Sequence, residues 1–118
     1  MKHFLVVVFI IFANFTMAEG MLGIPESFLG KWGGSKDSCS AQFPLDVLSI
    51  EEKRIIFWES SGKPKLIMFE NDELELTLHM VGEGEEWLSE EVYYLDASSQ
   101  VLTRRTKNGM FQYHKCTS

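Results

Sequence analysis

The feature that most constrains the fold is a series of short apolar segments separated by turn residues, one of which alternates without a break. In residues 74–80, leucine and methionine occupy every second position, and Glu75, Thr77 and His79 lie between them. Successive side chains of a strand point to opposite faces, whereas a helix needs apolar residues three and four positions apart. This segment is therefore predicted to be a strand with one buried face.

Similar segments recur about every ten residues, with glycine, proline, asparagine and serine in the gaps. The strongest hairpin signal is Asn108-Gly109. About eight strands are expected: one around Trp32, and others at residues 45–50, 54–59, 65–70, 74–80, 87–95, 101–106 and 110–116. Residues 60–64 are predicted to be a turn because Gly62 and Pro64 lie there. The pattern predicts an all-β antiparallel up-and-down meander closed into a small barrel, since closure removes exposed strand edges.

The first 18 residues have the layout of a secretory signal. A short basic start precedes an unbroken apolar run at residues 4–12, and small residues precede residue 19. The run is short for a membrane span, which takes about 20 residues. We expect residues 1–18 to be a cleaved signal peptide and residues 19–118 to form a single β-barrel domain, periplasmic or extracellular. The alternative is a retained membrane anchor.

The sequence contains two cysteines, Cys39 and Cys116. In a secreted protein, two cysteines are most simply interpreted as one disulfide formed in an oxidising compartment. The bridge would join the beginning of the domain to its end, and the ends of a closed meander are neighbours. Metal ligation and a catalytic thiol are the alternatives, but no Cys-x-x-Cys motif supports them. Alternation groups Cys116 with Gln112 and His114, opposite Phe111 and Tyr113, which places the bridge outside the barrel.

A motif near the start resembles a known family. Gly30-x-Trp32, preceded by Pro25 and Phe28, resembles the Gly-x-Trp signature of lipocalins and related small barrels. The resemblance covers the first strand and the meander. Residues 19–118 are fewer than in typical lipocalins, and no helix is predicted before the last strand. The chain is thus similar to a shortened lipocalin-like barrel of the kind found in small secreted bacterial proteins.

The resemblance implies a role for the motif. In lipocalins the tryptophan packs across the closed end of the barrel, often beneath a basic residue from the last strands. Gly30 and Trp32 are therefore expected to form a barrel-end plug. Arg104 or Arg105 would cover Trp32 through a cation–π contact.

The densest charge cluster is the acidic turn that contains Glu83, Glu85 and Glu86. Such a turn can contact a basic partner or hold Ca²⁺ through carboxylate oxygens. The spacing is not that of an EF-hand loop, and glutamates around a glycine are typical of a solvated hairpin tip. We retain partner contact as the functional hypothesis and expect no metal site.

Several function classes are disfavoured. The formal net charge is −6, and no basic stripe with interleaved aromatic residues suggests nucleic-acid binding. No Gly-x-Ser-x-Gly elbow and no phosphate-binding glycine loop followed by a helix occurs. His79 and His114 are interpreted as surface residues. We therefore expect neither an enzyme nor a bound cofactor, and no membrane span after signal cleavage.

The expected function is that of a secreted, monomeric binding module of unknown target. Large leucine, methionine and phenylalanine side chains should fill a small barrel, which favours action through the surface. One alternative is a lipocalin-like carrier of a small apolar ligand, with lining residues Leu74, Leu76, Leu78, Phe57 and Leu66. The other is an inhibitor of a basic secreted hydrolase, acting through the acidic turn.

Overall fold

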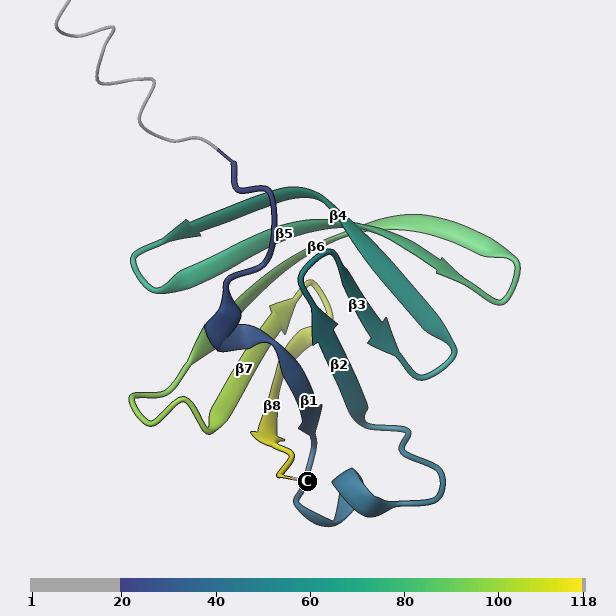
Figure 1. Ribbon diagram of the computed structural model, residues 1–118. Coiled ribbons are helices and arrows are strands. Elements are labelled where there is room, and N and C mark those ends of the chain that lie inside the picture. Colours follow the sequence, from purple (N-terminus) through teal and green to yellow (C-terminus); the bar gives the residue numbers. More distant parts are fainter. Residues whose placement is uncertain (1–19, 118) are drawn as a thin grey trace, which may run out of the picture.

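The computed structural model describes residues 20–117, which form a closed eight-stranded β-barrel (Figure 1). All neighbouring strands are antiparallel, and β1 pairs with both β2 and β8. The predicted all-β meander is thereby confirmed. The predicted signal peptide, residues 1–18, lies outside the described residues. The elements in order are η1 (Glu26–Phe28), β1 (Gly30–Gly33), η2 (Asp37–Ser40), β2 (Val47–Glu51), β3 (Arg54–Phe57), β4 (Ser60–Glu70), β5 (Glu73–Gly82), β6 (Glu85–Leu95), β7 (Val101–Thr106) and β8 (Gly109–Lys115).

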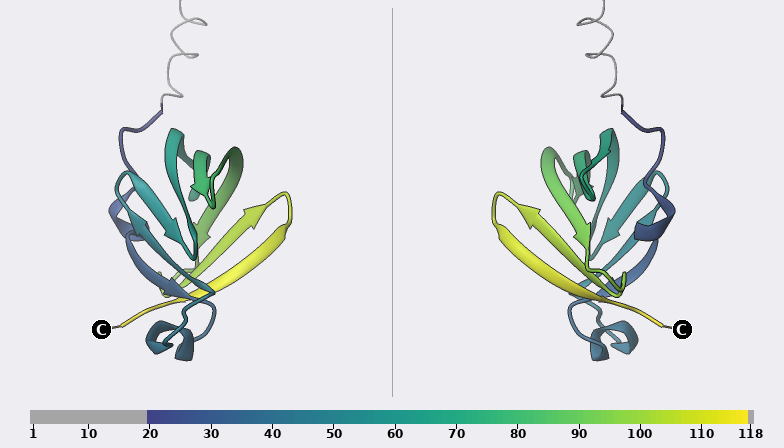
Figure 2. Two further views of the ribbon diagram at one scale, coloured as in Figure 1. Left: turned by 90° about the vertical axis from the view of Figure 1, so that its right-hand side faces the viewer. Right: turned by 90° about the vertical axis from the view of Figure 1, so that its left-hand side faces the viewer.

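The alternating segment forms β5, and its apolar residues face the barrel interior. Leu74, Leu76, Leu78 and Met80 are all buried. They pack in one core cluster with apolar residues from the first and last strands, including Trp32. In the left view of Figure 2, β1–β3 and β7–β8 form facing walls, and β4–β6 lie between the two sides. Side chains from these walls therefore meet inside the barrel.

The turn predicted at residues 60–64 is wrong, because β4 begins at Ser60. The chain reverses one step earlier, where Glu59 has a φ of 63°. Gly62 faces Met80, and a β-carbon on Gly62 would lie 2.5 Å from the Met80 sulfur. The glycine therefore makes room for a core side chain. It does not form a turn.

Pro64 also belongs to β4, at a place where a proline is tolerated. The pairing of β3 with β4 ends at Gly62, so Pro64 has no β3 partner. The register with β5 shifts between Pro64 and Leu66, and prolines in sheets are confined to such bulges and edges. The shift leaves Ile67 buried and Leu66 47% exposed. Leu66 is therefore not a lining residue of the interior, contrary to expectation.

The barrel closes along a short seam between β1 and β8. Only two residue pairs join these strands, and one of them is Trp32 with Lys115. The Cys116 amide donates to the Lys31 carbonyl at 2.9 Å, just beyond the end of β8. The predicted disulfide between Cys39 and Cys116 is confirmed. It reinforces the seam.

The disulfide lies on the outer side of the seam, as alternation along the last strand predicts. Trp32 points into the barrel, so its neighbour Gly33 presents its other side outward. A β-carbon on Gly33 would lie 3.0 Å from the Cys39 sulfur. The bridge therefore clasps the barrel from outside and takes no space in the core.

Trp32 closes one end of the barrel. Its side chain is 0% exposed, and the indole Nε1–H donates to the Phe28 carbonyl at 3.0 Å. The Phe28 ring in turn packs edge-on against Phe69, with 5.9 Å between ring centroids. The 3₁₀ turn η1 therefore covers the tryptophan.

The basic residue over Trp32 is Lys115, so the expectation that Arg104 or Arg105 covers it is not met. The Lys115 ammonium nitrogen lies 5.0 Å from the indole centroid and donates to the Leu29 carbonyl at 3.4 Å. The strand register explains the difference. Lys115 is the direct cross-strand partner of Trp32, whereas Arg104 is paired with Tyr93 on one side and Phe111 on the other.

Candidate functional site: the open end of the barrel

Away from Trp32, polar side chains enter the barrel interior from β6 and β7. Glu91 is in phase with buried Tyr93 and is paired with Leu76, so it points inward; it is 3% exposed. Arg104 is in phase with buried Leu102 and is paired with Tyr93, so it points inward as well. The inward positions of β6 and β7 are thus apolar in one part of each strand, at Tyr93 and Leu102, and polar in the other, at Glu91 and Arg104.

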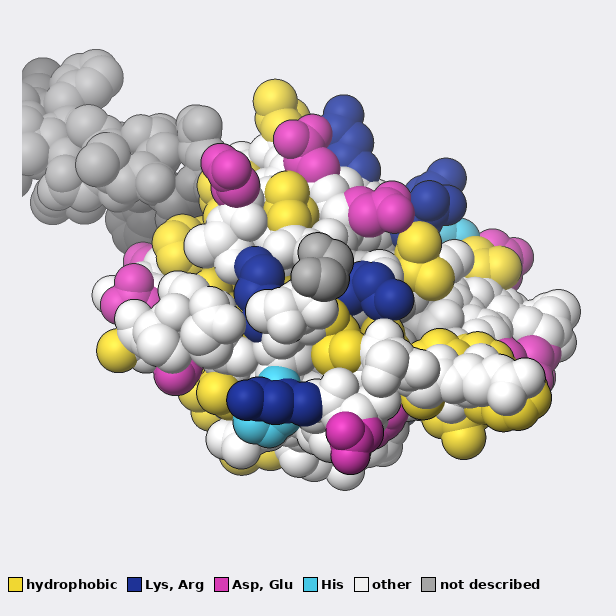
Figure 3. Space-filling view, turned by 60° about the horizontal axis from the view of Figure 1, so that its bottom comes forward, with side chains coloured by type: hydrophobic (Ala, Val, Ile, Leu, Met, Phe, Trp, Pro, Cys, Tyr) yellow, Lys and Arg dark blue, Asp and Glu magenta, His cyan; other side chains and the backbone are white. Residues whose placement is uncertain are grey.

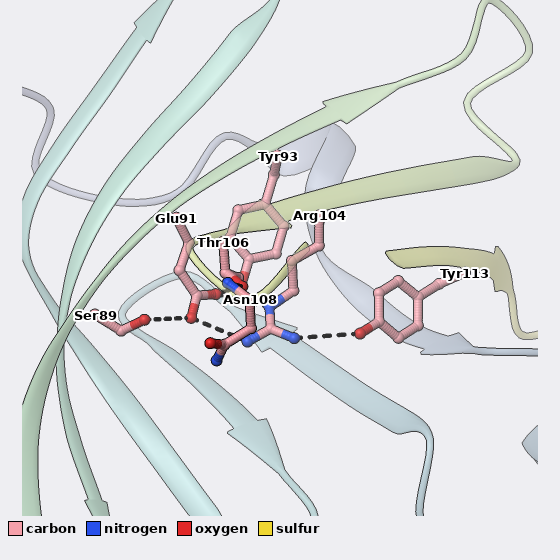
Figure 4. Close-up of polar contacts among 7 residues, drawn as sticks. All are labelled: Ser89, Glu91, Tyr93, Arg104, Thr106, Asn108 and Tyr113. Atoms are coloured by element: carbon pink, nitrogen blue, oxygen red, sulfur yellow. Dashed lines mark hydrogen bonds and ion pairs between the residues drawn. The ribbon is translucent and has the colours of Figure 1, made fainter. Parts of the chain in front are cut away.

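Glu91 and Arg104 form a two-point ion pair (Figure 4). Arg104 Nε donates to Glu91 Oε1 at 2.7 Å, and Arg104 Nη2 donates to Oε2 at 3.0 Å. The hydroxyl of Ser89 donates to Oε2 at 2.7 Å, and that of Tyr93 donates to Oε1 at 2.6 Å. Arg104 Nη1 also donates to the Tyr113 hydroxyl at 3.4 Å. The carboxylate therefore accepts four hydrogen bonds, as a buried charge requires.

Two aromatic rings flank the guanidinium. The Arg104 Cζ atom lies 4.7 Å from the centroid of Phe57 and 5.6 Å from that of Phe111. Phe57 ends β3 and Phe111 lies on β8, so the two rings reach Arg104 from opposite walls of the barrel. Such cation–π contacts hold a guanidinium in one orientation and contribute about 0.5–2 kcal/mol each.

The charge states of this cluster follow from burial and partners. Burial alone would raise the pKa of Glu91, but the hydrogen bonds and charge of Arg104 outweigh it, so the pKa lies below its ordinary value. Burial would lower the pKa of Arg104, but the hydrogen bonds to Glu91 outweigh it and the pKa is raised. Burial, followed by the charge of Glu91, raises the pKa of Tyr93 well above its ordinary value. At neutral pH the cluster is therefore an ion pair beside a protonated tyrosine.

The ion pair lies at the floor of a pocket of ≈ 570 Å³ that opens at this end of the barrel. Phe57 and Trp87 contribute aromatic walls, and Lys107 and Asn108 lie on the turn between β7 and β8. Small-molecule sites of proteins have volumes of about 300–1,000 Å³ and combine apolar walls with a few polar groups. This pocket has both properties.

Four other hollows on residues 20–117 are not lined by Arg104, and Glu91 borders one of them. One of ≈ 310 Å³ involves Leu66, Met68 and Thr77 on the outer side of β4 and β5. Another of ≈ 450 Å³ lies near Phe28 and Asp96, at the end closed by Trp32. We assign the candidate site to the open-end pocket because both members of the ion pair line it, and their polar atoms are held in place by hydrogen bonds.

The acidic turn forms the tip of the β5–β6 hairpin. Glu83 has a φ of 50° and Gly84 a φ of 79°, and both are exposed. Glu86 contacts His79 Nε2 at 2.9 Å on the outer face. Glu85 differs from the other two glutamates because it lines the open-end pocket. No group of three potential metal ligands is found among residues 20–117.

Exposed apolar residues accompany this hairpin tip. Val81, Trp87 and Leu88 are all more than two-fifths exposed, and Leu88 reaches 59%. Figure 3 shows hydrophobic side chains on the projecting right-hand part of the molecule with acidic side chains beside them. The hairpin therefore presents apolar and acidic groups together.

The Glu91–Arg104 pair was not anticipated from the sequence. No role is predicted for Glu91 from the sequence, whereas Arg104 is expected to cover Trp32 by family resemblance. The sequence pattern that could have identified both residues is the alternation of inward and outward positions along a strand. Glu91 lies two residues before Tyr93, and Arg104 two residues after Leu102, so each charge occupies an inward position of its strand.

Comparison of the sequence and structure with protein families, curated proteins and solved structures found no significant match. Within the described part of the chain, no helix has the length and apolar character needed to cross a membrane.

Proposed function

We propose that this protein is a secreted, lipocalin-like binding protein whose ligand site is the open-end pocket. The single observation that supports this proposal best is the division of the barrel interior. Apolar side chains fill the end near Trp32, whereas the other end holds a pocket of ≈ 570 Å³ with a fixed ion pair at its floor. The expectation of an entirely filled interior applies only to the first of these parts.

The chemistry of the floor favours binding over catalysis. A general acid or base works best when its pKa is near the working pH. Glu91 has a pKa below its ordinary value, and its two oxygens already accept hydrogen bonds from Arg104, Ser89 and Tyr93. Such a carboxylate orients a neighbour well and transfers protons poorly.

Neighbouring serines provide a matched test of this function. Ser60 lines the pocket, whereas Ser61 points to the opposite face of β4. Ligand-observed NMR with a mixture of small aromatic compounds should detect binding to the wild type and to Ser61→Phe. Ser60→Phe should lose that binding because its ring fills the pocket. Equal binding by both variants, or no binding by the wild type, would refute the proposal.

We propose contact with a basic protein, such as a secreted hydrolase, as a second function. The exposed Trp87 and Leu88 lie beside Glu83 and Glu86 at a hairpin tip, and the chain has a formal net charge of −6. Opposite charges accelerate association and apolar side chains supply contact area. Surface plasmon resonance against immobilised lysozyme, a basic hydrolase, tests this function. A Glu83→Lys, Glu86→Lys variant that bound as well as the wild type would contradict it.

A further inference from the structure

We infer that the open-end pocket takes a small, planar, uncharged ligand that carries a carbonyl-type oxygen. This inference rests on the proposed ligand-binding function and specifies the class of ligand. It follows from three features of the pocket: the remaining hydrogen-bond donors of Arg104, the balance of charges, and the aromatic walls.

Arg104 has more donors than its protein partners use. A guanidinium carries five N–H groups. Within residues 20–117, two of them donate to Glu91 and one donates to Tyr113. The side chain is 18% exposed and lines the pocket, so the remaining N–H groups are accessible from it. Because a guanidinium has no acceptor, the group it selects on a ligand must be an acceptor, and an oxygen fits best.

The charges of the pocket are balanced without a ligand. Glu91 neutralises Arg104 by direct contact, and the same pocket contains one further acid, Glu85, and one further base, Lys107. An anionic ligand at Arg104 would bring a second negative charge close to Glu91 in a partly buried site, which costs free energy. A cationic ligand would meet the Arg104 charge instead. An uncharged acceptor avoids both costs.

The walls of the pocket suit a flat ligand. Phe57 stacks against Arg104 and also lines the pocket, and Trp87 adds a second aromatic surface. Aromatic rings prefer stacked or edge-to-face contacts with other rings. Asn108 at the mouth supplies both an amide donor and an amide acceptor. A ring that bears an amide or a related carbonyl group matches these surfaces.

Four probes of similar shape test the inference. Benzamide, benzoate and benzamidinium share one outline and carry charges of zero, minus one and plus one, whereas toluene has no acceptor. Each is titrated at pH 7 into the ¹⁵N-labelled protein, and the side-chain N–H signals of Trp87 and Asn108 are followed. Benzamide is expected to bind at least roughly 10-fold more tightly than each of the other three, the difference typical of a hydrogen bond to a charged group.

Variants test the contribution of the Arg104 hydrogen-bond donors separately from that of the rest of the pocket. Arg104→Lys keeps a positive charge opposite Glu91 but loses the forked donor, so its benzamide affinity should fall to that of toluene. Asn108→Ala is a second, independent variant on an exposed turn, and it should weaken benzamide and leave toluene unchanged. Arg105→Lys is the matched control, because Arg105 is exposed and lies next to Arg104 on the outer face. Its affinities should equal those of the wild type.

The outcomes distinguish this inference from the proposed function. If toluene, benzoate or benzamidinium binds as tightly as benzamide, the pocket is a ligand site but the inference about ligand class is wrong. If none of the four probes shifts the Trp87 and Asn108 signals at tens of millimolar, the ligand-binding function itself is contradicted.

Discussion

Arg104 Nε lies 2.7 Å from Glu91 Oε1 inside the barrel, and the Glu91 residue is only 3% exposed. This ion pair separates an apolar end, closed by Trp32, from an end that opens to a pocket. Removing one member of a buried ion pair leaves the charge of the other uncompensated, which lowers the free energy of unfolding by about 3–5 kcal/mol. The pair is therefore expected to fix the geometry of the pocket floor as well as its charge.

The first prediction concerns pH. Because the pKa of Glu91 is lower in the folded protein, its contribution to stability is present above the unfolded-state pKa, about 4.3, and is lost as the pH falls through the folded-state pKa. Urea unfolding of wild type and Glu91→Gln between pH 7 and pH 2 should show the larger acid loss in the wild type. Glu90→Gln, on the outer face, serves as control and should follow the wild type. Parallel profiles for wild type and Glu91→Gln would contradict the prediction.

The second prediction concerns the disulfide across the β1–β8 seam. Cys39 and Cys116 are 77 positions apart, and closing such a loop stabilises the folded state by about 4 kcal/mol through loss of unfolded-state entropy. Cys39→Ser, Cys116→Ser should lower the free energy of unfolding by about 2–5 kcal/mol in urea titrations. Intact-mass analysis of the wild type should show two hydrogens fewer than the reduced chain. An unchanged free energy of unfolding in the double variant would show that the disulfide does not stabilise the β1–β8 seam.

The strands were predictable because they depend on local pattern, and the disulfide was predictable because the sequence contains two cysteines. Period-two alternation in residues 74–80 identifies an inward face whatever the partner strands are. The turn at residues 60–64 was wrongly predicted for the opposite reason. Gly62 is required by contact with Met80, which comes from a different strand, and Pro64 is accommodated by a register shift. Neither requirement can be read from the local sequence.

The candidate site was less predictable than the fold. Assigning Arg104 to Trp32 needs the register of β1 against β8, which depends on how the barrel closes. In the structure that register pairs Trp32 with Lys115. Glu91 lies among exposed acidic residues in the sequence, and its burial depends on Arg104, 13 positions away. Pairs that stabilise each other only after folding leave no local pattern.

The third prediction tests the closed end. Trp32→Ala removes a fully buried indole and should lower the free energy of unfolding by about 3–5 kcal/mol. Trp58→Ala is the control. Because Trp58 is 40% exposed, this substitution should lower the free energy of unfolding by less than half as much. Thermal and urea unfolding measure both. If the two variants were equally stable, Trp32 would not be the plug of the barrel.

The fourth prediction tests which base covers Trp32. Lys115→Met removes the ammonium group over the indole but keeps most of the side-chain volume, and should cost about 1 kcal/mol. Arg105→Met, an exposed site on the neighbouring strand, should change stability by less than about 0.5 kcal/mol. A larger effect at Arg105 than at Lys115 would contradict the cation–π contact described above.

The most direct test of the account follows the three tryptophan indole N–H signals during a benzamide titration. Trp87 lines the open-end pocket, Trp32 closes the opposite end, and Trp58 lies at the β3–β4 turn. A saturable shift of the Trp87 signal is expected, with the Trp32 signal unmoved. Saturable shifts at Trp32 without a shift at Trp87, or no shift at any indole with benzamide or with the other three probes, would contradict a ligand site at the open end.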